Sequence, residues 1–146
     1  MSFEVIALQG EHVAFIHEVM RENEGALHAE EVSLDEWREY LLIEDPDEAH
    51  FIILFENAPA AWLKLNGLEG KKTAWISMLV VRRACQRQGL GSFAVRYAED
   101  FARARNFREM GIHTTLDNAI AFGCYTKMGY KASKDKKQYT FRKKLK

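Results

Sequence analysis

The chain has 146 residues, 47% of them apolar and 29% charged, which are the size and balance of one globular domain with its own core. No apolar run is long enough to span a membrane and the first twelve residues carry no basic segment, so neither a membrane span nor a signal peptide is expected. The formal net charge is zero, but 15 of the 21 acidic residues lie in residues 1–60 and 19 of the 21 basic residues lie in residues 61–146.

The N-terminal half predicts two helices and an antiparallel meander. Residues 3–8 form a short predicted strand, and apolar side chains over residues 13–20 then follow a helical spacing that stops near Gly25. Ser33 and Glu36 form a capping box that opens a second helix. Three further strands are predicted over residues 50–55, 60–65 and 73–81, joined by turns at residues 56–59 and 69–72.

The C-terminal half predicts helices between strands. The predicted elements are a helix from Leu90 to near Asn106, a strand over 110–115, a helix over 117–128 closed by Gly129, and a last strand over 138–145. Because helices join the later strands, some pairing there should be parallel, and the chain is assigned to a mixed α/β (α+β) class.

Two glycines, Gly89 and Gly91, stand one residue apart where the strand over 73–81 gives way to a helix. A helix that opens on such a turn exposes backbone N–H groups that bind phosphate, and the missing side chains let the phosphate approach. The alternative is a plain turn that needs glycine only for its dihedral angles.

Two nucleotide motifs fit this turn poorly. A P-loop requires a lysine that the sequence after Gly91 does not supply. Residues 89–94 match the dinucleotide pattern G-x-G-x-x-A, but they follow an antiparallel meander and not the first strand of a doubly wound sheet. A dinucleotide-dependent enzyme is therefore disfavoured.

The loop and a second motif resemble those of the GNAT superfamily of acetyl-CoA-dependent N-acetyltransferases. The loop is Gln86-Arg87-Gln88-Gly89-Leu90-Gly91, similar to the family's Q/R-x-x-G-x-G/A, and the second motif is Asn118-x-x-Ala121-x-x-x-Tyr125-x-x-x-Gly129-Tyr130. The resemblance covers residues 73–130. It implies a single domain over residues 1–146 with a GNAT-like mixed sheet of about six to seven strands, an antiparallel N-terminal meander, a parallel central pair and about four flanking helices.

The resemblance also implies acetyl-CoA as cosubstrate, with no metal. The pantetheine arm would pair with the backbone of Leu79, Val80 and Val81, and the pyrophosphate would bind the N–H groups of Gln86, Arg87, Gln88, Gly89, Leu90, Gly91 and Ser92. Asn118 would steady the pantetheine and Phe122 would pack beside it. The basic C-terminal half suits so anionic a ligand.

Amide formation from a thioester needs a neutral amine, a polarised carbonyl and a proton for the leaving thiolate. Tyr125 stands where the family places the general acid, for direct attack in a ternary complex; alternatively it is a core aromatic whose hydroxyl is bonded locally. Many relatives carry Glu or His at the strand positions held here by Trp75 and Ser77, and neither of these is a base. Trp75 either walls the amine pocket or belongs to the core, Ser77 could hold a water, and His113 and Glu56 are possible relays.

The acceptor is expected to be cationic. By the resemblance, the segment after the first strand lines the acceptor site, and it contains Glu18, Glu22, Glu24, Glu30, Glu31, Asp35 and Glu36. This predicts a polyamine-like or aminoglycoside-like molecule or a basic peptide amine, with Glu24, Trp75 and Ser77 as candidate substrate-binding residues. Alternatively, these charges are solvated helix faces.

Other partners are less favoured. The basic residues lack the interleaved aromatics of a nucleic-acid surface, and no membrane association is expected. Cys85 and Cys124 make neither a disulfide framework nor a metal cluster, which favours a reduced, cytoplasmic protein, either monomer or homodimer. Because no base stands at Trp75 or Ser77, a non-catalytic acyl-CoA-binding sensor or interaction module is a second hypothesis.

Overall fold

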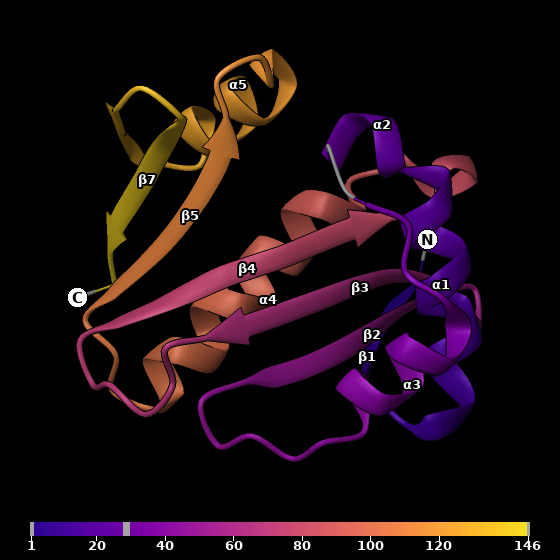
Figure 1. The fold of residues 1–146 in the computed structure, drawn as a ribbon. Coiled ribbons are helices and arrows are strands. Elements are labelled where there is room, and N and C mark those ends of the chain that lie inside the picture. The colour runs from indigo at the N-terminus through magenta and orange to yellow at the C-terminus, as the bar shows by residue number, and fades with distance from the viewer. Residues whose placement is uncertain (1, 28–29, 146) are drawn as a thin grey trace.

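The computed structural model describes residues 2–27 and 30–145, and within them a seven-stranded sheet has the order β1-β2-β3-β4-β5-β7-β6 (Figure 1). The strands are β1 Phe3–Ala7, β2 Ala49–Phe55, β3 Ala58–Asn66, β4 Thr73–Val81, β5 Glu109–Thr115, β6 Lys131–Lys134 and β7 Gln138–Lys144. Neighbouring strands are antiparallel except β4 and β5, which are parallel. The mixed α/β fold with a parallel central pair, expected from the sequence, is confirmed.

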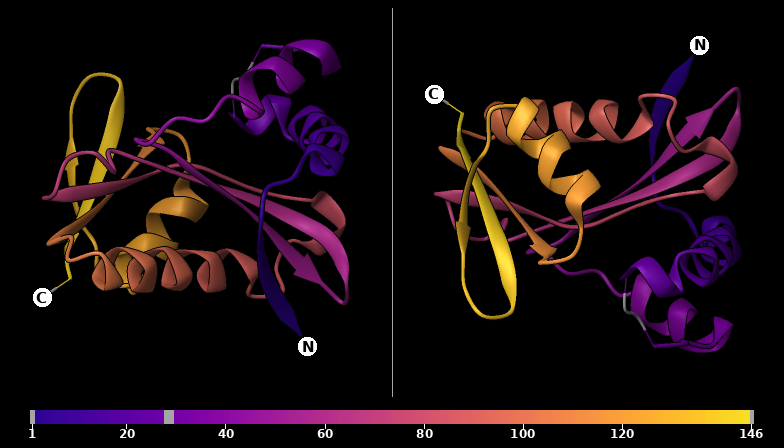
Figure 2. Two further views of the ribbon diagram at one scale, coloured as in Figure 1. Left: turned by 90° about the horizontal axis from the view of Figure 1, so that it is seen from below. Right: turned by 90° about the horizontal axis from the view of Figure 1, so that it is seen from above.

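Helices cover both faces of the sheet (Figure 2). They are α1 Val13–Glu22, α2 Glu24–Leu27, α3 Leu34–Leu41, α4 Leu90–Ala104 and α5 Ala119–Lys127, with short 3₁₀ turns at Gly10–His12 and Arg83–Cys85. The N-terminal helices lie on one face, and α4 and α5 lie on the other. Each face therefore has a core of its own: α1 and α3 bury Ile52 and Trp62, whereas α4 buries Leu63 and Ile76.

An irregularity in β4 shapes the centre of the sheet. Lys64 of β3 pairs with Met78 and Leu65 pairs with Ile76, so Ser77 has no residue opposite it. The extra residue exchanges the two faces of β4: Ile76 and Leu79 pack on the α4 side, whereas Met78 packs on the α1 side. A β-bulge of this kind bends its strand and raises the local twist.

The parallel pair separates just beyond this bulge. The pairing of β4 with β5 ends at Ile76 and Ile112, although β4 continues to Val81 and β5 to Thr115. The two strands diverge toward their C-terminal ends, and α5 follows β5 (Figure 1). The edge of β4 from Ser77 onward is therefore left open toward β5.

Most predicted elements lie where the sequence places them, with three local differences. The strand β6 was not predicted, since all four of its residues are exposed and polar or small. The first helix ends at Glu22, and α2 follows it as a separate short helix. The first hairpin turns at Glu56 and Asn57, both with positive φ, because β3 already begins at Ala58.

Candidate active site

The opening between the diverging strands holds a cavity, here called the cleft. It is lined by Ile76, Ser77, Met78 and Leu79 of β4, by Ile112, His113, Thr114 and Thr115 of β5, and by Asn118, Ala121 and Tyr125 of the α5 segment. The cleft thus combines an open strand edge with side chains from a second strand and a helix. An extended ligand could add to such an edge through main-chain hydrogen bonds.

Tyr125 lies at the inner side of the cleft. Its ring packs against Phe141 and Tyr130, with centroid distances of 5.4 and 6.0 Å. Burial, with a smaller contribution from Cys124, raises the pKa of Tyr125 to about 12. The phenol therefore keeps its proton at neutral pH and is a hydrogen-bond donor.

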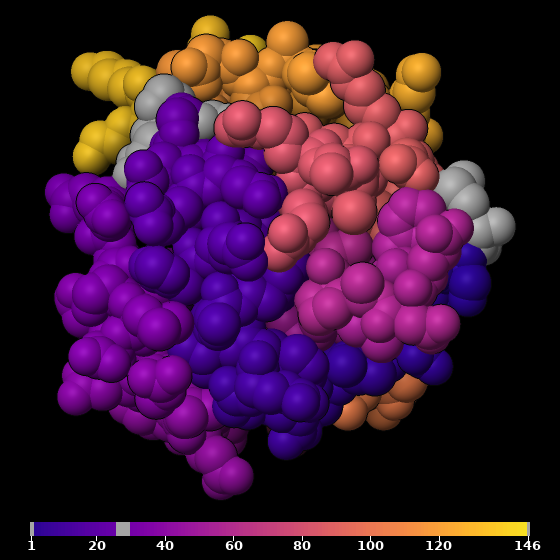
Figure 3. All heavy atoms as spheres, turned by 90° about the vertical axis from the view of Figure 1, so that its right-hand side faces the viewer, coloured from indigo at the N-terminus to yellow at the C-terminus, as the bar shows by residue number. Residues whose placement is uncertain are grey.

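A second cavity, here called the groove, adjoins the cleft and extends to the N-terminus of α4. It contains most of the residues that were predicted to bind the cosubstrate: Leu79, Val80, Val81, Gln86, Arg87, Gly89, Leu90, Gly91, Ser92, Asn118 and Tyr125. Asn23, Cys85, Ile120, Ala121 and Cys124 complete its lining. In Figure 3 the salmon segment that follows β4 lies at the surface between the N-terminal helices and the orange α5 region.

Two predicted residues lie elsewhere. Gln88 is not among the described residues that line the groove, and neither is Phe122. The ring of Phe122 packs instead against Tyr139 and Phe141, with centroid distances of 4.9 and 5.5 Å. Phe122 is thus part of the aromatic packing under α5.

The two glycines of the loop do different things. Gly89 is the N-cap of α4 and has a φ of 84°, in the left-handed region that glycine adopts without strain. Gly91 has no such φ, and a Cβ there would meet no atom within 4 Å. Gly89 is therefore required by the turn, whereas Gly91 leaves the floor of the groove bare.

The N-terminus of α4 suits an anion. No side chain caps it and its first turn carries no acidic residue, so its N–H groups and its helix dipole face the groove. Arg87 also lines the groove and has no ion-pair partner among the described residues. The combination fits a ligand phosphate.

The start of the loop is fastened to α1. The side-chain amides of Asn23 and Gln86 both donate to the carbonyl of Val81, at 3.3 and 3.1 Å. Arg82 pairs with Glu18 at 3.2 Å, and the carboxylate of Glu22 accepts a hydrogen bond from the backbone N–H of Arg83 at 3.0 Å. Two of the acidic residues expected at an acceptor site, Glu18 and Glu22, therefore hold the loop.

A third cavity, here called the aromatic pocket, lies on the α1 face. It is lined by Met20, Glu30, Val32, Trp37, Tyr40, Trp62, Lys64 and Met78. Met78 also lines the cleft, so the two cavities meet at β4. Glu30, one of the acidic residues expected at the acceptor site, lines the aromatic pocket, and this pocket shares Met78 with the cleft.

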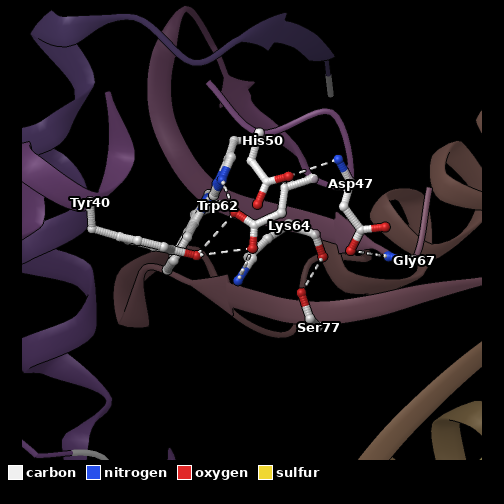
Figure 4. Close-up of polar contacts among 9 residues, drawn as sticks. Tyr40, Asp47, His50, Trp62, Lys64, Gly67 and Ser77 are labelled. Carbon is white, nitrogen blue, oxygen red and sulfur yellow. Dashed lines mark hydrogen bonds and ion pairs between the residues drawn. The ribbon is translucent and has the colours of Figure 1, made fainter. Parts of the chain in front are cut away.

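A polar network closes the base of the aromatic pocket (Figure 4). Lys64 pairs with Glu48 at 2.9 Å and lies 5.2 Å from the centre of the Tyr40 ring. Glu48 also contacts His50, whose Nδ1 accepts a hydrogen bond from the indole of Trp62 at 3.2 Å. The hydroxyl of Ser77, on the next strand, donates to the carbonyl of Lys64 at 3.4 Å.

The network is balanced in charge. Burial acts to raise the pKa of Glu48, but Lys64 and His50 outweigh it and hold that pKa below its usual value. Burial also acts against the charge of Lys64, yet Tyr40 and Glu48 raise its pKa. Burial lowers the pKa of His50 despite Glu48. Lys64 and Glu48 are thus both ionised and compensate each other.

Three further residues predicted from the sequence as substrate-binding or relay candidates are Trp75, Glu24 and Glu56. The ring of Trp75 stacks on that of His113 with centroids 4.6 Å apart, and the guanidinium of Arg142 lies 5.2 Å from the indole. Trp75 is therefore neither in a helix-covered core nor free to meet an external cation. Glu24 begins α2 and Glu56 lies at the first hairpin turn, and neither lines the groove, the cleft or the aromatic pocket.

The sequence agrees with this geometry. The acetyltransferase (GNAT) family model matches residues 12–130, which include the loop, β4, β5 and α5. The chain belongs to the GNAT acetyltransferase family. It is accordingly an acyl-CoA-dependent N-acetyltransferase. No curated protein matches it in sequence.

Solved GNAT structures share the fold over the whole chain. A PaiA N-acetyltransferase from Thermoplasma acidophilum in complex with coenzyme A has a TM-score of 0.81 at 20% identity, with 99% of each chain covered. A spermidine N-acetyltransferase chimera of SpeG from Vibrio cholerae and hSSAT has a TM-score of 0.85 at 17% identity, covering 99% of this chain and 96% of that one. RimL, a ribosomal-protein alpha-N-acetyltransferase in complex with coenzyme A, scores 0.83 at 19% identity, with 99% and 94% covered. At these identities the likeness is one of fold.

Two further features bear on the type of site. In the described ranges, no group of three or more His, Cys, Asp or Glu side chains could hold a metal ion. None of the helices in those ranges is both long enough and apolar enough to cross a membrane.

Sequence reasoning missed several residues of the site. Asn23 lies at the end of α1, 58 residues from the Val81 carbonyl that it binds, and no local pattern connects the two. The aromatic pocket combines residues from α1, α3, β3 and β4, each of which alone is typical of an amphipathic core face. The signal that could have found it is a lysine, Lys64, inside an otherwise apolar strand.

Proposed function

We propose that this GNAT protein transfers an acetyl group from acetyl-CoA to a primary amine of a cationic small molecule or peptide. The amine attacks the thioester directly in a ternary complex, and Tyr125 is the general acid. The observation that carries the proposal is the position of Tyr125, which lines both the groove and the cleft and keeps its proton.

The residues that line the groove support acetyl-CoA as its ligand. The bare N-terminus of α4, with Arg87, suits the phosphates, and the open edge of β4 over Leu79–Val81 suits an extended amide-containing arm. Asn118 lines both cavities, so its side chain is available to the same arm. When bound, acetyl-CoA supplies the thioester carbonyl and the thiolate leaving group.

The chain's own groups supply the rest of the chemistry. Backbone N–H groups on the open edge of β4 can donate to the carbonyl oxygen, where negative charge develops. The hydroxyl of Tyr125 donates its proton to the leaving sulfur. Because a phenol of raised pKa is always protonated at neutral pH, this donor is ready in each catalytic cycle.

The aromatic pocket supports a cationic acceptor. Glu30 brings a carboxylate to it, and Trp37 and Tyr40 offer ring faces that attract cations. The charge of Lys64 is already compensated by Glu48, so it does not oppose a second cation as an isolated lysine would. A structural relative named as a spermidine N-acetyltransferase is consistent with such an acceptor.

The test is release of thiol from acetyl-CoA with matched amines. Diaminobutane and butylamine have the same carbon chain and differ by one charge, so we expect a higher kcat/KM for the diamine and a loss of that preference in Glu30→Gln. Tyr125→Phe should lower kcat by about 10²–10⁴ while acetyl-CoA still raises the Tm. Equal use of both amines would contradict the cationic acceptor, and an unchanged kcat in Tyr125→Phe would contradict the general acid.

A further inference from the structure

Among the described residues that line the cleft, two have side chains that can act as acid or base in water, Tyr125 and His113. The other residues that line it in the described chain are apolar, hydroxyl-bearing or amide-bearing. Tyr125 keeps its proton in the resting protein, so it cannot take the first proton from the alkylammonium before attack. His113 carries the imidazole, which is the side chain that most readily accepts a proton near neutral pH.

His113 is held in one orientation from two sides. Its ring stacks on Trp75 at an interplanar angle of 12°, and its Nδ1 lies 3.1 Å from the hydroxyl of Thr140. If Nδ1–H donates to Thr140, Nε2 carries the free lone pair that a base requires. Thr140 and Trp75 thus orient the imidazole ring of His113 without adding a charge beside it.

We propose that His113 is the general base that takes the proton from the acceptor amine, with Thr140 and Trp75 as its positioning residues. The inference rests on the proposed function and deepens it, because it names the base that the β4 positions Trp75 and Ser77 do not provide. It also gives Trp75 a function: the indole holds the base instead of binding the acceptor.

The proton balance closes with these two groups. His113 takes one proton from the alkylammonium, and the neutral nitrogen attacks the carbonyl carbon to form the C–N bond. The C–S bond breaks and Tyr125 protonates the sulfur. The second proton that the nitrogen loses restores the Tyr125 phenol, and His113 releases its proton to solvent.

Three charged side chains lie near His113 or the indole on which it stacks. Arg142 of β7 stands over Trp75 and pairs with Glu109 of β5 at 3.0 Å, so those two charges compensate each other. Asp135, in the turn between β6 and β7, lies close enough to His113 for their charges to interact.

The test compares two amines of one shape and different basicity in the full-length protein. Ethylamine is protonated at pH 7, whereas trifluoroethylamine is largely neutral and needs no base. His113→Gln retains a hydrogen-bonding side chain and should lower kcat/KM for ethylamine by about 10²–10³, but by less than tenfold for trifluoroethylamine. Acetyl-CoA should raise the Tm of the variant as it does that of the wild type.

Each other outcome has a distinct meaning. An equal loss with both amines, or no loss, overturns the role of His113 while leaving the transferase reaction intact. Absence of thiol release by the wild type with every amine contradicts the proposed function itself. If His113→Gln does not fold, Thr140→Val tests the same idea: it should lower kcat for ethylamine with little change in KM, and an unchanged kcat overturns the proposal.

Discussion

The indole of Trp75 lies against Gly111 of the neighbouring strand, so closely that a Cβ on Gly111 would come within 2.4 Å of the ring. The two residues are paired in register across β4 and β5, immediately before these strands separate. Trp75 in turn stacks on His113. Because Gly111 has no side chain, there is room for the indole of Trp75 in this position, from which it stacks on the proposed base His113.

Gly111→Ala should displace the indole and destabilise the protein. The contact involves ring carbons in the middle of a sheet, which cannot move away freely, so we expect a loss of about 2–3 kcal/mol in the free energy of unfolding. Urea unfolding measures the loss. Gly123→Ala is the matched control, because a Cβ there meets open space on a helix, and it should be neutral or stabilising. Equal stabilities of the two variants would contradict this packing.

The glycine loop predicts opposite effects on stability and on binding. Gly91→Leu places a branched side chain on the floor of the groove but in an ordinary helical position, so stability should be unchanged or rise by up to about 1 kcal/mol. Affinity for acetyl-CoA, measured by calorimetry, should fall about tenfold or more, because this side chain, unlike the Ala that the family's loop accepts here, fills the approach of the phosphate.

Gly89→Ala is the counterpart. Its positive φ makes any side chain there strained, so this variant should lose about 1–2 kcal/mol of stability. A Gly91→Leu variant that binds acetyl-CoA as the wild type does would show that the bare groove floor at Gly91 is not needed for binding.

The sequence was sufficient for most of the helices and strands and for the place of the glycine loop between β4 and α4. Hydrophobic periodicity depends on which face of each segment is buried, and this chain buries regular faces in α1 and α4. The capping box of Ser33 and Glu36 was found because both of its hydrogen bonds are local, and both are present. β6 was missed because an exposed edge strand has no buried face to give it a pattern.

The chemistry of the cleft depends on a feature with no sequence signal. The bulge at Ser77 exchanges the two faces of β4, so counting alternate residues along the strand gives the wrong side for Met78 and Leu79. The site of His113 likewise depends on where β5 leaves β4, and this follows from tertiary packing. The contacts of Glu18 with Arg82 and of Glu22 with Arg83 join residues 64 and 61 positions apart, so no local pattern could have shown them.

Lys64→Met should be costly at neutral pH and less costly in acid. The side chains of Lys64 and Glu48 are 14% and 17% exposed, so removing the cation leaves a carboxylate mostly buried without its main partner. We expect a loss of about 2–4 kcal/mol at pH 7.

The sign of the pH effect follows from Glu48. Its pKa is lowered in the folded state, so the pair stabilises the fold above the ordinary value of 4.5 and loses this effect as the pH falls through the folded value. The difference between wild type and Lys64→Met should therefore shrink on acidification toward pH 4. Chemical denaturation at several pH values measures it, with the exposed Lys71→Met as control. A difference that does not vary with pH would show that the lysine contributes packing instead of charge.

The second tyrosine of the α5 motif is predicted to be structural. The hydroxyl of Tyr130 donates to the carboxylate of Glu99 at 2.7 Å, and Glu99 is only 3% exposed and also binds Lys143. Tyr130→Phe removes one donor from a buried carboxylate, which should cost about 1–3 kcal/mol of unfolding free energy. Because Tyr130 lines neither the groove nor the cleft, the KM for acetyl-CoA and kcat should remain those of the wild type.

Tyr139→Phe is the matched control for Tyr130→Phe, since no hydrogen bond of the Tyr139 hydroxyl is found within residues 2–27 and 30–145. It should change stability by less than about 0.5 kcal/mol. Urea unfolding and thiol-release kinetics on both variants separate the two functions of the motif. If Tyr130→Phe were as stable as the control but slower in turnover, the proton donor would involve Tyr130 as well as Tyr125. If Tyr130→Phe instead loses stability but keeps normal kinetics, the two tyrosines of the motif have separate functions. Tyr125 then acts in the chemistry, and Tyr130 binds the buried carboxylate of Glu99 in α4.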